Sequence, residues 1–460
     1  MRIALPNGLR DAQRLAYLLG ASCACVRPSF SICGIATHSG EVQKGDLFVC
    51  LSGTRTNGAA YIGEAVENGA AAILAAQDAL QEFRVPTFYC DDVVGALLRA
   101  AAAYRKEIAA RVIAVTGSCG KTTVKEAIAA VLGNVPHSEG NFNSRIGMPL
   151  SVLSMPSASH WVLELGINAC GEMREMAEAL SPDVAVITNV GSAHIGAFGD
   201  FSTLLSEKLE IAHALGKEGV LILPEQLPAA TLHASCRVVR VGDAAGDAVT
   251  CKKRESEAGI CCDLSFGDRC VTDLCWPIPL QIGASVIGLA GAVGILEGRS
   301  DEEIRQGLLV AGARTPRLRR ESVGECIFLD DCYNASPEAM ITSLEVLAKI
   351  GEGRPLVAVL GDMAELGAYA AALHDAVGAF AAKLPLFTLY TYGKEAMAIA
   401  DGAARMGMSR DHIRRYHEHE RAALIDALME ELPTDAAVLY KASHKMAMAD
   451  ILQAVKEGIV

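Results

Sequence analysis

The residues with the clearest chemical capacity follow an apolar, β-branched run from Val112 to Thr116. Gly117-Ser-Cys-Gly-Lys-Thr-Thr123 comes next, and then a stretch from Val124 to Leu132 whose apolar positions 124, 128, 131 and 132 share one helical face. Backbone amides of such a strand–loop–helix unit close around phosphate oxygens, and a lysine reaches the terminal phosphates. We therefore expect Lys121 to bind nucleotide phosphates and Thr122 to ligate Mg²⁺.

This glycine loop is a variant of the generic phosphate loop. Val115 stands where that pattern has a glycine, five residues before Gly120. A glycine turn with an incidental lysine is the alternative, and the strand and helix on either side argue against it. Holding phosphates does not separate a kinase, an ATPase motor and a ligase, so other residues must decide the reaction.

Three further side chains could bind cations or phosphates. Glu164 ends an apolar run, where a carboxylate can hold Mg²⁺ against a nucleotide, and a neutral imidazole such as that of His194 can hold a second cation. Each of these residues taken alone is more often structural. For Lys208, composition alone favours a solvated helix lysine paired with Glu207 or Glu210.

The elements that must position these residues alternate between strands and helices. Strand-like runs at 161–165, 184–189 and 220–223 alternate with helical stretches, which predicts a doubly wound parallel sheet. A second series begins after Arg317, with strands expected near 326–330, 356–360, 386–391 and 436–440. The first hundred residues predict a small α/β unit, which a helix at 94–110 connects to the rest. We expect an α/β fold of three domains, at residues 1–108, 109–314 and 315–460.

Composition limits the partners and the compartment. The formal net charge of −13 disfavours nucleic acid or an anionic membrane as the main partner. Isolated cysteines in core-like surroundings, such as Cys50, Cys90 and Cys170, predict free thiols in the cytoplasm. The densest group of cysteines has no C-x-x-C pair, which argues against a zinc site; its members are Cys251, Cys261, Cys262, Cys270 and Cys275.

Two apolar stretches raise the question of a membrane. Leu15 to Leu19 could pass for a short signal-peptide core, but Asp11 and the polar residues that follow it argue against this. The uncharged run from Leu274 to Leu296 is long enough to span a bilayer. Its prolines and glycines instead favour a strand that turns into a buried helix, with Gly283 near the junction. We expect no membrane insertion.

Several segments match a known family in the same order along nearly the whole chain. They read T-G-S-x-G-K-T-T at 116–123, N-x-N-x-x-I-G-x-P at 141–149, E-x-G-x-N at 164–168, N-x-x-x-A-H at 189–194 and K-x-E-I at 208–211. This set resembles the Mur ligases and the related folylpolyglutamate synthetases. Asp330 to Pro337 and Leu360 to Gly367, followed by His374, resemble the branch that adds D-alanyl-D-alanine to a UDP-linked muramoyl-tripeptide. The first of these segments disfavours the folylpolyglutamate branch.

The resemblance implies ATP and two Mg²⁺ ions as ligands, and a substrate carboxylate that attacks the γ-phosphorus to give an acyl phosphate. It implies a carbamylated Lys208, an Arg317 that reaches the γ-phosphate, and an Asp331 that meets the ribose. The implied catalytic residues are Lys121, His194, Lys208 and Arg317. The implied nucleotide-binding residues are Gly117, Ser118, Cys119, Gly120, Lys121, Thr122, Thr123, Asp331, Tyr333 and Asn334. The implied metal ligands are Thr122, Glu164, His194 and Lys208. The implied substrate-binding residues are Ser39, Asn141, Asn143 and Asn168.

The resemblance also assigns the domains. The first would bind the UDP group, the second ATP, and the third would complete the site by closing over the second, which excludes water from the acyl phosphate. We expect a monomer.

Three segments depart from the family pattern. Thr37-His-Ser-Gly40 replaces T-D-S-R, Ala284-Ser-Val-Ile-Gly288 replaces H-N-x-x-N near the adenine, and Lys441-Ala-Ser-His444 replaces K-G-S-R. Three interpretations therefore stay open: the D-alanyl-D-alanine ligase, a diverged ligase that joins other partners, and a non-catalytic nucleotide-binding relative.

Overall fold

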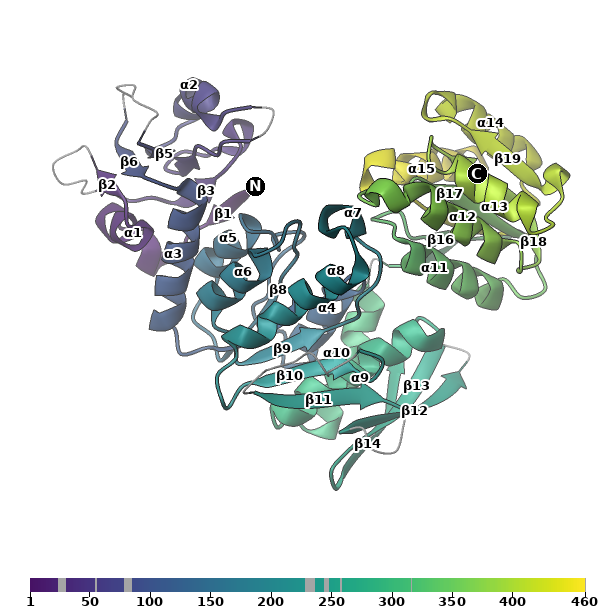
Figure 1. Ribbon diagram of the computed structural model, residues 1–460, viewed down its shortest axis with the longest axis horizontal. Coiled ribbons are helices and arrows are strands. Elements are labelled where there is room, and N and C mark those ends of the chain that lie inside the picture. The colour runs from purple at the N-terminus through teal and green to yellow at the C-terminus, as the bar shows by residue number, and fades with distance from the viewer. Residues whose placement is uncertain are drawn as a thin grey trace.

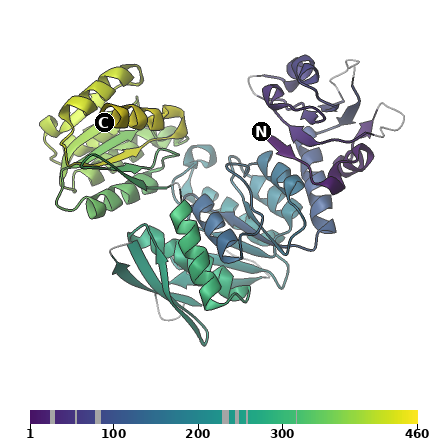
Figure 2. The same ribbon diagram turned by 180° about the vertical axis from the view of Figure 1, so that it is seen from behind.

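The structure is a computed structural model that describes residues 1–23, 30–53, 56–77, 85–227, 236–243, 248–256, 259–315 and 317–459. Figures 1 and 2 show three units of sheet and helix, with the purple N-terminal unit and the yellow-green C-terminal unit on opposite sides of the central one. The prediction of a three-domain α/β fold is confirmed. The exact boundaries, 108/109 and 314/315, stay a proposal.

The first sheet has the strand order β1-β3-β4-β5-β6-β2. Strands β3 to β6 are parallel, and β1 and β2 are antiparallel to their neighbours at the edges. The strands are β1 (Arg2–Ala4), β2 (Ser22–Cys23), β3 (Gly34–Ala36), β4 (Leu47–Val49), β5 (Ala72–Ala76) and β6 (Thr87–Cys90); the helices are α1 (Ala12–Leu19), α2 (Ile62–Glu67) and α3 (Val93–Glu107).

The stretch that could pass for a signal-peptide core lies in α1. The side chain of Asp11 caps this helix by accepting a hydrogen bond from the backbone of Arg14, at 2.7 Å. Leu15 and Leu19 are fully buried in the core of the first unit. These leucines therefore serve the packing of the domain.

The second sheet carries the glycine loop. Its strand order is β14-β13-β12-β11-β10-β9-β7-β8. The strands are β7 (Arg111–Thr116), β8 (His160–Glu164), β9 (Val184–Ile187), β10 (Val220–Pro224), β11 (Arg237–Gly242), β12 (Val249–Ser256), β13 (Gly259–Phe266) and β14 (Arg269–Trp276). The helices are α4 (Lys121–Val131), α5 (Gly147–Ser154), α6 (Glu172–Leu180), α7 (Ile195–Phe198), α8 (Phe201–Leu209), α9 (Leu280–Leu296) and α10 (Asp301–Arg314).

The second sheet is parallel over most of its width, as predicted, and antiparallel at one edge. The strands from β8 to β12 pair in parallel, but β13 and β14 pair antiparallel. A tight turn at Gly267 joins β13 to β14, and a hairpin of this kind needs no helical crossover. The sheet is therefore mixed, with its parallel part around the glycine loop.

The long apolar run after Leu274 is the end of β14 followed by α9. Val286, Ile287 and Ala290 of this helix are buried in the core of the second unit, so the predicted turn from strand to buried helix is confirmed. Gly283 lies within the first turn of α9, where a Cβ would come within 2.2 Å of the Ile278 carbonyl oxygen. Within the described residues, the structure has no helix with the length and apolar character needed to cross a membrane.

The third sheet has the order β15-β16-β20-β17-β18-β19. All pairs are parallel except β15 with β16. The strands are β15 (Arg319–Val323), β16 (Cys326–Asp330), β17 (Leu356–Gly361), β18 (Leu386–Tyr392), β19 (Ile413–Tyr416) and β20 (Ala437–Lys441). The helices are α11 (Pro337–Ile350), α12 (Ala370–Ala381), α13 (Met397–Arg405), α14 (Arg421–Glu431) and α15 (Met448–Ile459). All four strands predicted for this domain are present.

The cysteines differ from expectation in two ways. Cys261 and Cys275 form a disulfide between β13 and β14, so the prediction of free thiols fails for this pair. Cys170 is exposed, whereas Cys50 and Cys90 are buried as predicted. The pair was missed because antiparallel neighbours 14 residues apart bring two sulfur atoms together only once the hairpin is known.

Candidate active site

The glycine loop turns tightly between β7 and α4. Gly117 has φ of +150°, and a Cβ there would lie 2.0 Å from the Oγ1 atom of Thr188, so only glycine fits. Gly120, with φ of +77°, is the N-cap residue of α4. Lys121 and Thr122 therefore begin the helix, and Thr123 is buried in its first turn. The predicted strand–loop–helix unit is present.

Two lysines share one carbonyl of this loop. Lys121 Nζ donates to the Gly117 oxygen at 2.9 Å and to the Ser118 oxygen at 3.2 Å. Lys208 Nζ, from α8, donates to the same Gly117 oxygen at 3.1 Å. Burial, and then repulsion from Lys121, lowers the pKa of Lys208 to about 7. The structure thus places a buried amine with a large neutral fraction beside the phosphate loop.

The alternative of a solvated Lys208 is wrong, because this side chain is only 1% exposed. Its two acidic neighbours in sequence bind elsewhere. Glu207 accepts hydrogen bonds from the backbone of Gly171 and Met173 at the start of α6, and Glu210 pairs with Arg174. The sequence could not show this, since α8 places Lys208 inward and pairs both glutamates with α6.

Glu164 lies at the end of β8, next to the loop strand. Its buried carboxylate accepts a hydrogen bond from Thr122 Oγ1 at 2.8 Å and another from Asn143 Nδ2 at 2.6 Å. A hydroxyl, a carboxylate and an amide in contact form the hard oxygen donor set that Mg²⁺ prefers. Within the described residues, no group of three or more His, Cys, Asp or Glu side chains is placed to hold a metal ion.

The segment after β9 supports the loop from beside it. The backbone oxygen of Asn189 accepts from Ser118 N at 3.0 Å, and its side-chain oxygen accepts from Cys119 N at 2.9 Å. Thr188 Oγ1 donates to the Cys119 carbonyl at 2.5 Å. Sequence reasoning assigned no role to these two residues, although Asn189 opens one of the quoted motifs. They fix which loop amides can face a phosphate.

His194 lies five residues further along, and it contacts the third domain. Its Nδ1 atom is 2.5 Å from Oε2 of Glu365. Nearby, Ser192 donates to Glu338 through both its backbone and its hydroxyl, at 2.7 and 2.8 Å. Cys119 Sγ lies 3.0 Å from Ser336 Oγ. The glycine loop and the His194 segment thus both contact the third domain, whose contacting residues, Ser336, Glu338 and Glu365, had no role assigned from the sequence.

Residues predicted to reach ATP from the third domain lie close to one another. The Arg317 guanidinium stacks on the Tyr333 ring, with Cζ 4.1 Å from the ring centroid. Asp331 is buried, and its Oδ2 accepts hydrogen bonds from Ser343 Oγ at 2.8 Å and from the Lys441 ammonium. Lys441 also donates to the Asn334 carbonyl at 2.9 Å. This buried ion pair holds the segment that carries Tyr333 and Asn334.

The predicted substrate-binding residues are more widely spread. Asn143 contacts Glu164, as described above, and Asn141 and Asn168 are exposed. Ser39 lies in the first domain, in the short helix η2 (Ser39–Glu41), and its buried hydroxyl donates to Glu64 at 2.7 Å. The contacts of the structure therefore bring one of the four to the Glu164 carboxylate, and their roles stay predictions.

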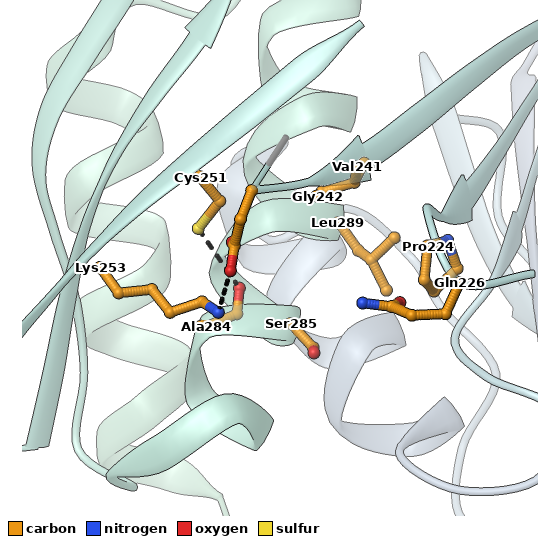
Figure 3. Close-up of a pocket in the computed structure, with 10 residues that line it drawn as sticks. Pro224, Gln226, Val241, Gly242, Cys251, Lys253, Ala284, Ser285 and Leu289 are labelled. Atoms are coloured by element: carbon orange, nitrogen blue, oxygen red, sulfur yellow. Dashed lines mark hydrogen bonds and ion pairs between the residues drawn. The ribbon is translucent and has the colours of Figure 1, made fainter. Parts of the chain in front are cut away.

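The segment that departs from the family's adenine pattern lines a small cavity. Ala284 and Ser285 face the ends of β10 and β11, and a Lys253–Asp243 ion pair lies at the cavity wall (Figure 3). The cavity has a volume of about 30 Å³, which holds about two water molecules and is too small for a purine.

Comparison with known proteins identifies the family. Sequence models of the Mur ligase family catalytic domain, the Mur ligase middle domain and the Mur ligase glutamate ligase domain match residues 31–118, 115–266 and 317–444. The chain is 33% identical to the UDP-N-acetylmuramoyl-tripeptide--D-alanyl-D-alanine ligase of Bacillus subtilis, over 92% of this chain and 93% of that protein. It is 30% identical to the Escherichia coli protein of the same name, over 92% and 94%.

Solved structures agree with the sequence relatives. A crystal structure of MurF from Acinetobacter baumannii superposes with a TM-score of 0.86 at 27% identity, covering 97% of this chain and 98% of that one. MurF ligase from Thermotoga maritima in complex with ADP gives 0.77 at 26% identity, covering 92% and 97%. Similarity to these proteins in fold and sequence extends along almost the whole chain, and the glycine loop, the Glu164–Thr122 pair and the buried Lys208 lie within the matched residues. The chain belongs to the Mur ligase family.

Proposed function

We propose that this chain is an ATP-dependent, ADP-forming ligase that joins D-alanyl-D-alanine to UDP-N-acetylmuramoyl-tripeptide in peptidoglycan precursor synthesis. One observation carries the proposal. Lys121, Lys208 and the Glu164–Thr122 pair surround a single phosphate loop, in a chain that matches ligases of that name over nine-tenths of its length.

The proposed reaction has two steps. A carboxylate oxygen of the tripeptide attacks the γ-phosphorus of ATP, the bond to the β-phosphate oxygen breaks, and ADP leaves. The amine of D-alanyl-D-alanine then attacks the acyl carbon, and phosphate leaves as the amide forms. Such transfers need positioning and charge neutralisation more than a protein nucleophile. We propose that Lys121 and Arg317 neutralise the negative charge on the γ-phosphate. We assign no covalent role to any cysteine.

The oxygen donors around Glu164 fit one Mg²⁺ ion, and we propose a second; both ions would neutralise phosphate charge. Thr122 and Glu164 would hold one ion, and His194 and a carbamylated Lys208 the other. Carbamylation needs a neutral amine, because its lone pair attacks the carbon of CO₂ with loss of one proton. A pKa of about 7 makes that form of Lys208 abundant at neutral pH, which supports the proposal.

We also propose that the protein acts as a monomer in the cytoplasm, on small substrates and without nucleic acid. Reducing conditions there would keep the Cys261–Cys275 pair as two thiols. None of the site contacts described above involves either cysteine. The ligase reaction is therefore expected to proceed in either redox state.

The diverged ligase stays the second candidate, because of the changed segments in the first and second domains. Ser39 is followed by Gly40 in place of the family's arginine, and Ala284 and Ser285 stand in place of the histidine and asparagine near the adenine. We expect these changes to alter the recognition of UDP and adenine. They leave the γ-phosphate chemistry unchanged.

The deciding experiment incubates the purified protein with Mg-ATP, UDP-N-acetylmuramoyl-tripeptide and D-alanyl-D-alanine, each substrate being omitted in turn. Phosphate release and product mass are followed beside a Lys121→Ala variant. Phosphate release that needs both substrates, with a product heavier by the dipeptide and absent from the variant, is the expected result. A folded protein that binds ATP and gives no product would refute the assignment. Turnover with another amine or carboxylate would support the diverged ligase.

A further inference from the structure

We propose that Glu365 is a positioning residue of the ligase site: it docks the third domain onto the second and orients the ring of His194. The inference rests on the proposed function for its catalytic consequence, and on contacts between described residues for its structural part. Glu365 belongs to the Leu360 to Gly367 segment, which has no other assigned role.

The segment that carries Glu365 is held by hydrogen bonds. His374 is fully buried in α12; its Nε2 atom accepts a hydrogen bond from Met363 N at 2.9 Å, and Nδ1 donates to the Ala370 carbonyl at 2.7 Å. Asp362 Oδ1 accepts from Ala396 N at 2.7 Å. These bonds fix the backbone on both sides of the point where Glu365 projects.

Four contacts join the Glu365 segment to the segment that carries His194. Besides the bond between Glu365 and His194, the Glu365 carbonyl accepts from Gly196 N at 3.2 Å, and Tyr369 OH donates to the Gly199 carbonyl at 2.7 Å. Gly196 and Gly367 meet so closely that a Cβ on Gly196 would lie 2.6 Å from Gly367 N. Helix α7 thus fits against the short helix η5 (Gly367–Tyr369), with no room for side chains at the crossing.

Both ends of the bond between Glu365 and His194 have strained backbone. Glu365 has φ of +65° and His194 has φ of +66°, in the left-handed region that is unfavourable for a non-glycine residue. Strained residues of this kind persist where the surrounding structure requires them, and they gather at functional sites. Two such residues that hold one another favour a functional reason for the pair.

The consequence for catalysis concerns the second ring nitrogen. A carboxylate bound at Nδ1 fixes the proton there and leaves the lone pair on Nε2, as in the carboxylate–histidine pairs that support metal ligands. Glu365 comes from the third domain, so His194 takes this form only when that domain is docked. The Glu365 side chain thereby links docking of the third domain to the orientation of the His194 ring.

The test compares Glu365→Gly and Glu365→Gln with Glu430→Gln, a change at an exposed glutamate of α14. Glycine accepts the positive φ and removes the carboxylate, so the fold is kept while the contact is lost. Hydrogen–deuterium exchange of the peptide at 190–199 is measured without ATP or Mg²⁺, together with the thermal midpoint. kcat and KM for ATP are measured with all substrates.

For Glu365→Gly we expect faster exchange at 190–199 and a thermal midpoint close to that of the wild type. kcat should fall by about 10–100-fold, the range for residues that orient a metal-binding histidine, with KM for ATP changed far less. Glu365→Gln keeps an acceptor oxygen and should recover part of both effects, and Glu430→Gln should match the wild type.

Unchanged exchange and kcat in a folded Glu365→Gly protein would overturn the proposal, as would an equal loss in Glu430→Gln. The exchange measurement needs no substrate. A wild-type protein without ligase activity would therefore refute the proposed function, while the exchange data alone would decide the docking role.

Discussion

At the scale of single residues, a buried lysine behind the phosphate loop links the loop helix to the strand that carries Glu164. Lys125 is 1% exposed in α4, and its Nζ atom donates to the Ser138 carbonyl at 2.6 Å. Ser138 Oγ in turn accepts from Glu164 N at 3.0 Å. Burial lowers the pKa of Lys125, and the nearby charges of Glu164 and Glu126 oppose that shift. This residue therefore sets the distance between α4 and β8.

Lys125→Met is expected to lower both stability and turnover. The Ser138 carbonyl would lose its partner in the interior, which costs about 1–3 kcal/mol, and Glu164 would lose its support. Denaturant unfolding and kcat measure the two effects. Lys217→Met, at an exposed position, is the control. An unfolding midpoint and kcat equal to those of the control would show that Lys125 only fills space.

A second residue-scale prediction concerns CO₂. If Lys208 is carbamylated, turnover should fall in buffers freed of CO₂ and return when bicarbonate is added. Lys208→Met should be inactive under both conditions while it still binds ATP, because Lys121 and the loop amides remain. Steady-state rates and nucleotide binding at fixed pH are the measurements. Activity of the wild type that is indifferent to CO₂ would argue for an amine acting without the modification.

How far the site could be predicted depended on distance along the chain. Lys121, Thr122 and Glu164 follow strands that the sequence shows, so their neighbourhood was predictable. Asn189 contacts the loop directly, and Glu338 contacts Ser192 across 146 residues of sequence. Asn189 and Glu365 lie in quoted motifs, but the motifs do not show that Asn189 binds the loop or that Glu365 binds His194. Asp331 was expected at the ribose, and its ion pair with Lys441 depends on the pairing of β16 with β20.

At the scale of elements, the antiparallel edge that β13 and β14 form was not predicted, and the burial pattern of β14 gives one physical reason. β14 alternates buried and exposed side chains, with Val271 and Leu274 in the core and Thr272 and Asp273 outside. Such a strand covers one face only and lacks the continuous apolar run of β7, whose residues from Val112 onward are all buried. Continuous apolar runs like that of β7 could be predicted from the sequence in the central and third domains. The antiparallel edge of the second sheet could not.

His374 gives the segment between β17 and α12 a pH dependence. Burial lowers its pKa, with the Ala370 hydrogen bond and the charges of Asp362 and Glu395 acting in the opposite direction. Below the ordinary histidine value of about 6.5, the unfolded chain therefore binds more protons than the folded one. Stability from this group is complete above that pH and is lost as the pH falls through it.

The prediction is that the free energy of unfolding decreases from pH 7 to pH 5, and that His374→Gln decreases less over this range while being less stable at pH 7. Urea unfolding at several pH values is the measurement. His419→Gln, at an exposed site, should keep the wild-type slope. A His374→Gln slope equal to that of the wild type would assign the acid sensitivity to other groups.

At the scale of the whole molecule, few side chains decide how the domains meet. Tyr104 of α3 donates to the Met155 carbonyl at 2.9 Å and packs beside Trp161, which joins the first domain to the second. The second and third domains meet through the contacts of Glu338, Glu365 and Tyr369. Periodicity predicts each sheet, but it contains no information on such contacts, so the mutual placement of the domains required the structure.

The crossing of α7 and η5 allows the placement of the domains to be tested by sterics alone. In Gly196→Ala the new Cβ would lie 2.6 Å from Gly367 N, against backbone that cannot rotate away, so we expect the third domain to separate from the second. Small-angle scattering should show a larger radius of gyration without ligands, and kcat should fall, while each domain keeps its own core and hence its circular dichroism. Gly216→Ala is the matched control, since a Cβ there meets nothing within 4 Å. A Gly196→Ala protein with wild-type dimensions and kcat would mean that the crossing tolerates a methyl group, and that docking relies on the side-chain contacts of Glu338, Glu365 and Tyr369 instead.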